Sequence, residues 1–150
     1  MEQSFLGTGV AFPPQIDPAT GRFKMSGDKQ SVKESIYLIL MTQVTERLTR
    51  PYFGTQTQSY VFMDINQTEL TIMKRDLAES ILDQEPRIAS VEIDADIESG
   101  QGYVMINIDY VLAETNQRDN MVFPFYLNEE PKEFDEEEYY EPEIVDMEDY

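Results

Sequence analysis

The sequence predicts an α+β fold in which two helices pack on a small antiparallel sheet. Apolar residues recur at helical spacing in residues 28–41 and again in residues 67–84. Two later segments, residues 91–97 and 104–110, alternate apolar and polar side chains as half-buried strands do. Because both helical segments precede the strands, this order favours helices gathered on one face of an antiparallel sheet.

The segment before the first helix predicts an irregular N-terminal arm over residues 1–27. Residues 7–28 contain three prolines and four glycines, and the sequence Pro-Ala-Thr-Gly at 18–21 is typical of a turn. We therefore expect this arm to lack long regular elements.

Each helix carries a start signal and a buried face. Asp28 is suited to cap the first helix, and Asn66 with Glu69 has the spacing of a capping box for the second. Between the helices, Pro51 and Gly54 break regular structure and predict a polar loop. The expected buried positions are Val32, Ile36, Ile39 and Leu40 in the first helix and Leu70, Met73, Leu77 and Ile81 in the second.

The strand segments predict a hairpin followed by an edge strand. The sequence Ser-Gly-Gln-Gly at 99–102 separates the first two alternating runs and is typical of a hairpin turn. A third apolar run, residues 121–127, contains Pro124. Because proline has no N–H to donate to a strand ladder, the third strand is expected at an edge of the sheet.

The composition excludes several classes of function. The chain has 150 residues, 41% of them hydrophobic, which is enough for one domain with its own core. It contains no cysteine and no histidine, so disulfides, thiol nucleophiles, histidine bases and the usual zinc ligand sets are absent. The net charge of −19 repels phosphate backbones and anionic lipid, so we expect neither nucleic acid nor membrane as a partner. A calcium loop that begins at Asp94 would have Ser99 and Met105 where glycine and glutamate are required, so we also expect no metal, and no cofactor.

The negative charge is concentrated at the C-terminus. Residues 128–150 contain twelve acidic residues and one lysine, together with two prolines, which disfavours independent folding. The chain therefore divides into an arm (1–27), a folded domain (28–127) and an acidic tail (128–150). The tail also contains aromatic and aliphatic residues, so two interpretations stay open: a solvated acidic end, or a segment that orders against a basic, partly apolar partner.

The junction between the second helix and the first strand contains Glu85, Pro86 and Arg87. A residue that precedes proline disfavours helical geometry, so the helix is expected to end near Gln84. In an extended segment Glu85 and Arg87 share a face, which predicts a carboxylate and a guanidinium held side by side at a corner. Such a pair could bind complementary charges of a partner, or it could be a local ion pair that fastens the corner.

With this Glu-Pro-Arg motif the chain resembles the gene-25-like (GPW) family, the baseplate wedge proteins of contractile tails. The resemblance covers about residues 5–128, and one departure is Thr45, where the family commonly has a glycine before Glu46-Arg47. The acidic tail lies outside the family pattern. Further segments that follow the pattern are residues 9–12, 17–21, 35–40 with Thr42, the Pro-Tyr-Phe-Gly sequence at 51–54, and residues 120–127.

The resemblance implies a structural subunit without enzymatic activity that initiates the sheath of a phage tail, a type VI secretion apparatus or an extracellular injection system. It implies docking on the core bundle of wedge proteins, assembly in the cytoplasm into a six-fold baseplate, and hub or tube-proximal proteins as further partners. The residues implied for the wedge contact are Glu85, Pro86, Arg87, Glu46 and Arg47. An edge strand can also be extended by a partner's strand, and the expected sheath contact consists of Met121, Val122, Phe123, Phe125, Tyr126 and Leu127.

Two other functions deserve comparison. Members of this family have been labelled lysozyme-like, but glycoside hydrolysis needs two suitably spaced carboxyl groups, one with a raised pKa. Arg87 on the same face as Glu85 would lower the pKa of that carboxyl instead. A regulatory binding module of the same fold is the second alternative, and it would not require the Glu-Pro-Arg motif.

Overall fold

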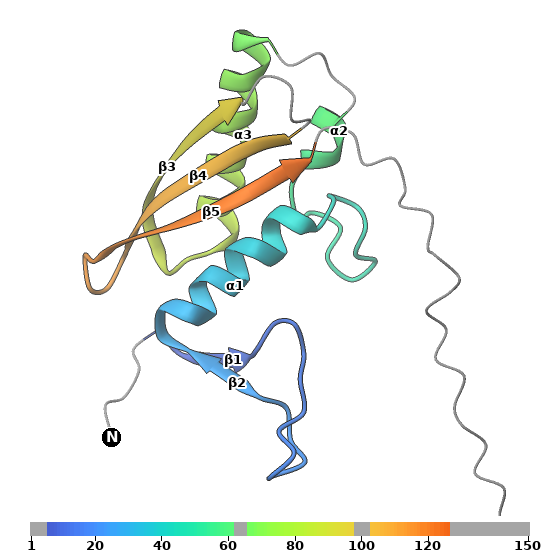
Figure 1. The fold of residues 1–150 in the computed structure, drawn as a ribbon, viewed down its shortest axis with the longest axis vertical. Coiled ribbons are helices and arrows are strands. Elements are labelled where there is room, and N and C mark those ends of the chain that lie inside the picture. Colours follow the sequence, from blue (N-terminus) through green and yellow to red (C-terminus); the bar gives the residue numbers. More distant parts are fainter. Residues whose placement is uncertain (1–5, 62–65, 98–102, 127–150) are drawn as a thin grey trace, which may run out of the picture.

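A computed structural model of the chain describes residues 6–61, 66–97 and 103–126 (Figure 1). The chain forms α+β architecture, as the sequence predicts, with a three-stranded antiparallel sheet, a smaller two-stranded sheet and helices between them in sequence. Leu127, the tail residues 128–150 and the expected hairpin turn at 99–102 lie outside the described residues. Within the described part, no helix is both long and apolar enough to span a membrane.

The helices are α1 (Asp28–Met41), α2 (Thr57–Val61) and α3 (Gln67–Gln84). The capping box of α3 is confirmed, because the Asn66 side chain accepts hydrogen bonds from the backbone of Thr68 and Glu69, and Glu69 reaches back to Asn66. The prediction that Asp28 caps α1 is wrong, since Asp28 is the first helical residue and Gly27 holds the cap position. The short helix α2 falls in a stretch too brief for a period to be visible in the sequence.

The main sheet has the strand order β3 (Ile88–Ile97), β4 (Tyr103–Leu112) and β5 (Arg118–Tyr126). Both pairings are antiparallel, and a register shift interrupts β3 between Ile88 and Ser90. The edge position of the strand that contains Pro124 is therefore confirmed. This strand begins three residues earlier than its apolar run indicates, because its first residues are polar.

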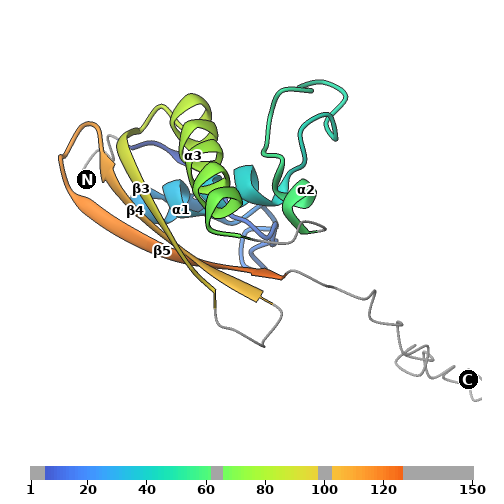
Figure 2. The ribbon, with the colours of Figure 1, turned by 90° about the horizontal axis from the view of Figure 1, so that it is seen from above.

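The core lies between the sheet and the helices, which cover one face of the sheet (Figure 2). Alternate residues of β4 point into this core and are buried, among them Ile106, Ile108 and Tyr110. From β5, Phe123 and Phe125 face the same way. The eight helical positions expected to be buried are all at most 3% exposed, so the helical and strand periods both identified the core faces correctly.

The N-terminal arm contains a small hairpin. Strand β1 (Thr8–Val10) pairs antiparallel with β2 (Met25–Gly27), and Ile16 forms an isolated bridge with Phe23. The arm extends away from the main sheet beyond the start of α1 (Figure 1). Its large apolar side chains are largely exposed, including Val10, Ile16, Phe23 and Met25.

Candidate functional site: the Glu-Pro-Arg corner and the open edge of the sheet

The corner between α3 and β3 begins where the sequence predicts. Helix α3 ends at Gln84, and Glu85 follows as its C-cap in an extended conformation, with φ −117° and ψ 91°. Pro86 excludes helical geometry at Glu85 and is itself exposed. The backbone N–H of Ile88 donates to the Glu85 carbonyl at 3.2 Å, so the chain turns sharply before β3 starts.

Glu85 and Arg87 form a bidentate ion pair inside this corner. The two oxygens of the carboxylate accept from Nε and Nη2 of Arg87, each at 2.7 Å. The Glu85 side chain is 3% exposed and that of Arg87 is 27% exposed. Of the two interpretations of the motif, the structure shows the local ion pair. The Glu85 carboxylate is buried and does not face outward toward a partner.

Arg87 also fastens two other segments of the chain to the corner. Its Nη1 donates to the carbonyl of Leu6 in the arm at 3.1 Å and to the hydroxyl of Ser31 in α1 at 3.2 Å. With the two bonds to Glu85, four of the five N–H donors of the guanidinium are used. Among the described residues, no group accepts from the fifth donor, which is on Nη2.

Burial and hydrogen bonding act on Glu85 in opposite directions. Burial raises the pKa of the Glu85 carboxyl, whereas hydrogen bonds from Arg87 and from Ser35 of α1 lower it. The hydrogen bonds outweigh burial, so the pKa of Glu85 is below its ordinary value. Glu85 is therefore ionised in the folded chain. A general acid of a glycosidase needs the opposite shift, so the geometry opposes the lysozyme-like alternative.

Gln84 holds a third segment, the loop at Gly54, to the corner. The sequence analysis did not identify this residue. Its side-chain amide accepts from the Gly54 N–H at 2.7 Å and donates to the Gly54 carbonyl at 2.8 Å. Gly54 has φ 110°, and a Cβ added there would lie 2.1 Å from the Thr42 carbonyl oxygen. Only glycine fits this approach. The signal available in the sequence was the position of Gln84 directly beside the motif.

The loop held by Gln84 contains the other two residues implied for the wedge contact. The Glu46 carboxylate accepts from the Gln43 N–H at 2.9 Å, and the Arg47 guanidinium lies 4.3 Å from the centre of the Phe53 ring. Both residues are exposed. Thr45 has φ 78°, the left-handed geometry that glycine adopts readily, which gives the physical reason for a glycine at this position in the family.

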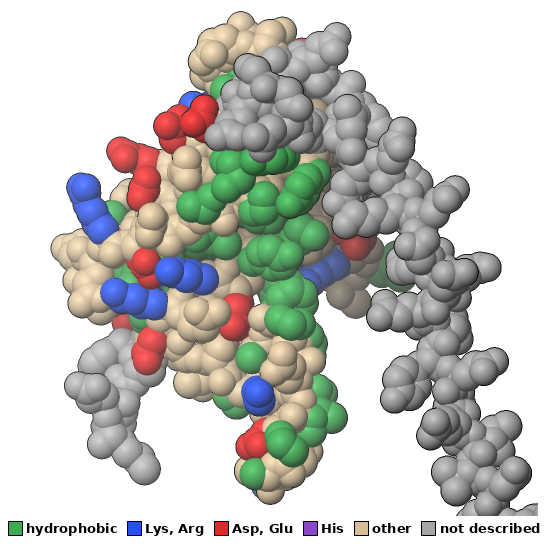
Figure 3. All heavy atoms as spheres, in the orientation of Figure 1, with side chains coloured by type: hydrophobic (Ala, Val, Ile, Leu, Met, Phe, Trp, Pro, Cys, Tyr) green, Lys and Arg blue, Asp and Glu red, His purple; other side chains and the backbone are tan. Residues whose placement is uncertain are grey.

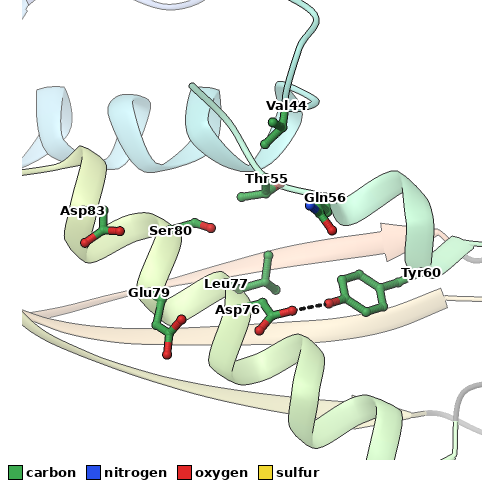
Figure 4. A pocket seen from close by; sticks show the side chains of 9 residues that line it. All are labelled: Val44, Thr55, Gln56, Tyr60, Asp76, Leu77, Glu79, Ser80 and Asp83. Atoms are coloured by element: carbon green, nitrogen blue, oxygen red, sulfur yellow. Dashed lines mark hydrogen bonds between the residues drawn. The ribbon is translucent and has the colours of Figure 1, made fainter. Parts of the chain in front are cut away.

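A separate polar pocket of about 250 Å³ lies between α3 and the segment that leads into α2 (Figure 4). The hydroxyl of Tyr60 donates to Asp76 at 2.6 Å, and burial together with this bond raises the Tyr60 pKa to about 12. None of the corner residues lines this pocket. Among the described residues, no group of acidic side chains could hold a metal ion. The lining residues are Val44, Thr55, Gln56, Tyr60, Asp76, Leu77, Glu79, Ser80 and Asp83.

The second candidate region is the outer edge of β5. In the described part of the chain only β4 pairs with β5, which leaves its other edge open. Pro124 has no N–H, and the Asn120 N–H donates to the Asp119 side chain at 2.9 Å. Neither residue therefore donates to β4. Since hydrogen-bonded and non-bonded pairs alternate in an antiparallel ladder, the N–H groups of Val122 and Tyr126 also point to the open edge.

The side chains expected at the sheath contact divide between the two faces of the sheet. Met121, Phe123 and Phe125 face the helices, whereas Val122 and Tyr126 are 48% and 51% exposed on the opposite face. Apolar side chains gather over this end of the sheet and continue toward the arm (Figure 3). The structure does not place the edge next to the corner residues, so the motif and the open edge are two separate regions.

A search among curated proteins gave no match, but a sequence family and several solved structures are similar to the chain. Residues 26–117 match the family described as baseplate wedge protein gp25. A proposed tail lysozyme from Geobacter sulfurreducens is 38% identical over 70% of this chain and 96% of its own, with a TM-score of 0.64.

Two baseplate assemblies contain similar chains. The anti-feeding prophage baseplate includes one that is 25% identical, with a TM-score of 0.56 over 82% of this chain and 87% of that one. A chain of the type VI secretion baseplate complex shares the fold, at 15% identity and a TM-score of 0.56, over 65% of this chain and 92% of that one.

The fold, the corner and these matches define a class of small α+β structural proteins of contractile-tail baseplates. The family match covers more than half of the chain and includes α1, α2 and α3, the corner and the first two strands of the main sheet. The chain belongs to the baseplate wedge protein gp25 family.

Proposed function

We propose that this protein is the wedge subunit that initiates the sheath in the baseplate of a contractile tail or injection particle. In this role it docks on the core bundle of wedge proteins and offers the first sheath ring an edge for strand addition. The observation that carries the proposal is the open edge of β5 in a chain of this family. An open edge with exposed apolar side chains is the feature that partner strands extend.

The wedge contact is proposed at the corner and at the loop attached to it. Pro86 is exposed, and Arg87 keeps one N–H donor and part of its surface for a partner. Glu46 and Arg47 are exposed on the loop that Gln84 holds. The buried Glu85 acts indirectly, because it fixes the orientation of Arg87. A rigid platform of this kind loses little conformational entropy when a partner binds.

The sheath contact is proposed along residues 121–127, of which Leu127 lies outside the described residues. A partner strand would pair with the N–H groups of Val122 and Tyr126, while Pro124 leaves one position without a donor. The competing edge, on β3, carries Glu92, Asp94 and Asp96, and charged side chains are a common protection of edges. This difference supports β5 as the edge that joins.

The site of action follows from the family. The anti-feeding prophage structure is a six-fold symmetrised baseplate, and we propose the same setting here, with assembly in the cytoplasm and with hub or tube-proximal proteins nearby. The role is structural and assigns no catalytic residue and no cofactor. A turnover assay of the purified subunit on peptidoglycan is expected to give no product above background.

Co-purification tests the wedge contact. The subunit is expressed with the wedge and sheath proteins encoded beside it, and the Arg47→Ala, Pro86→Ala double variant is expected to lose wedge capture at least about tenfold. Arg22→Ala on the exposed arm is the matched control and should retain capture. Normal capture by a folded double variant would remove the corner from the proposal.

A further inference from the structure

The sheet leaves part of α1 uncovered next to the open edge of β5. Figure 1 shows α1 running beside β5 on the side away from β4. A groove of about 430 Å³ lies between α1, residues Phe12 and Pro13 of the arm, and Met121 of β5. A fourth strand added to β5 would cover this groove, and its inward side chains would enter it. The lining residues are Phe12, Pro13, Gln30, Lys33, Glu34, Tyr37 and Met121.

The walls of the groove are aromatic and apolar. The Tyr37 ring packs against Phe12 with ring centres 5.9 Å apart and against Phe123 at 5.8 Å in an edge-on arrangement. Met121 forms the wall on the side of the strand. The groove therefore fits an extended segment that inserts large apolar side chains.

The rim of the groove carries charges of both signs. Lys29 and Lys33 lie on α1, and Lys33 pairs with Asp119 at 3.2 Å. Glu34 also lines the groove, but its carboxylate already accepts from Phe12, Ser26 and Gln30.

Arg118 at the start of β5 is exposed on the opposite face of the sheet, with Val122 and Tyr126, and does not line the groove. Two lysines, Lys29 and Lys33, therefore lie on the α1 side of the groove, and both acidic groups beside them, Glu34 and Asp119, already have partners. A matching ligand is acidic as well as apolar.

We propose that the occupant is the protein's own acidic tail, residues 128–150, which pairs with β5 and covers the groove. The tail combines twelve acidic residues with Phe134, Tyr139, Tyr140, Ile144 and Val145, which is the chemistry that the groove selects. The tail begins two residues after Tyr126, the last residue of β5. A strand opposite the nine residues of β5 needs about nine residues and a short turn, and the tail has 23. Such a short tether gives an effective concentration of about 1 mM.

The consequence concerns assembly and rests on the proposed function. If sheath strands add to β5, the tail occupies the same edge first and the sheath strand displaces it. Free subunits would then be protected from joining one another by their edges. The docking of the tail itself does not depend on any sheath contact.

Amide hydrogen exchange followed by NMR tests the docking in the full chain. The Val122 and Tyr126 N–H groups are expected to exchange at least about tenfold more slowly than in a chain that ends at residue 128. Among the described residues, every member of the buried core lies between Leu6 and Phe125, so the shortened chain retains that core. The Phe123 N–H, which points to β4, is the internal reference and should be protected in both.

Charge reversal in the full chain supplies the second arm. Lys29→Glu with Lys33→Glu is expected to remove the protection of Val122, whereas Arg22→Glu with Lys24→Glu on the arm should preserve it. Equal exchange of Val122 in the full and shortened chains would overturn the proposal. Protection that rises with protein concentration would assign the edge to a second copy and would also overturn it. If Val122→Pro loses capture by the sheath protein but the tail gives Val122 no protection from exchange, strand addition by the sheath is supported. Only the docking of the tail is then refuted.

Discussion

At the scale of single residues, the corner binds three other segments of the chain: the arm, α1 and the loop that contains Gly54. Arg87 reaches the arm at Leu6 and α1 at Ser31, while Glu85 accepts from Ser35 as well. Gln84 holds the loop at Gly54. The motif therefore stabilises the surface that we propose for docking, and the effects of its variants on folding and on assembly must be measured separately.

Arg87→Ala is expected to lower the free energy of unfolding by about 3–5 kcal/mol, because Glu85 is then left buried without its partner. The double variant Glu85→Gln, Arg87→Ala should lose less than the sum of the two single variants, since no unpaired charge remains. Urea denaturation of the four chains checks this. Additive effects would show that the pair does not couple.

The pH dependence of stability follows from the same pair. The pKa of Glu85 is below its ordinary value of 4.5 when folded, so its stabilising contribution is complete above that value and is lost as the pH falls through the folded pKa. Glu34 and Asp119 have lowered pKa values as well and act in the same direction. The melting temperature should be nearly constant between pH 6 and 8, because the chain has no histidine.

Below about pH 4.5 the melting temperature should fall, and Glu85→Gln should make this fall less steep. Melting curves of the wild-type and Glu85→Gln chains between pH 3 and 7 provide the comparison. The same slope in both chains would show that Glu85 is not part of the acid transition.

Gly54→Ala is expected to cost about 3 kcal/mol, because the new Cβ would collide with the Thr42 carbonyl oxygen. Gly21→Ala is the matched control. Gly21 also has positive φ, at 66°, but nothing lies within 4 Å of the added Cβ, so the expected cost is only about 1 kcal/mol. Equal losses in calorimetry would refute the role of close approach.

At the scale of elements, periodicity predicted most of the structure. Helix α3 runs over the expected residues because its capping box and the pre-proline residue fix both ends locally. The hairpin of the arm and helix α2 were not predicted, since each is only a few residues long and depends on contacts made elsewhere in the chain. The sequence left two orientations of Glu85 open and could not choose between them, because Ser35, which also binds this carboxylate, lies far away in the sequence.

The open edge of β5 predicts a contrast between neighbouring proline variants. Val122→Pro should cost no more than about 1 kcal/mol, because the Val122 N–H points away from β4. Met121→Pro removes an N–H that points to β4 and should cost about 3 kcal/mol. Chemical denaturation distinguishes them. A Val122→Pro chain as unstable as Met121→Pro would show that the edge has been assigned to the wrong set of residues.

At the scale of the whole molecule, the chain separates a fastened corner from an open sheet edge. The family match covers residues 26–117. Membership of this family was predicted from the sequence by the Glu-Pro-Arg motif and the Pro-Tyr-Phe-Gly segment. The contact surfaces with partner chains depend on the surfaces of those partners, so one sequence could only indicate which residues carry them.

The most direct measurement is an electron cryomicroscopy map of the assembled baseplate with its first sheath ring. The account predicts a strand from a sheath subunit beside β5, with backbone hydrogen bonds to the N–H groups of Val122 and Tyr126 and an apolar side chain over Tyr37. A map in which the β5 edge faces solvent, or in which the sheath strand pairs with β3, would contradict it.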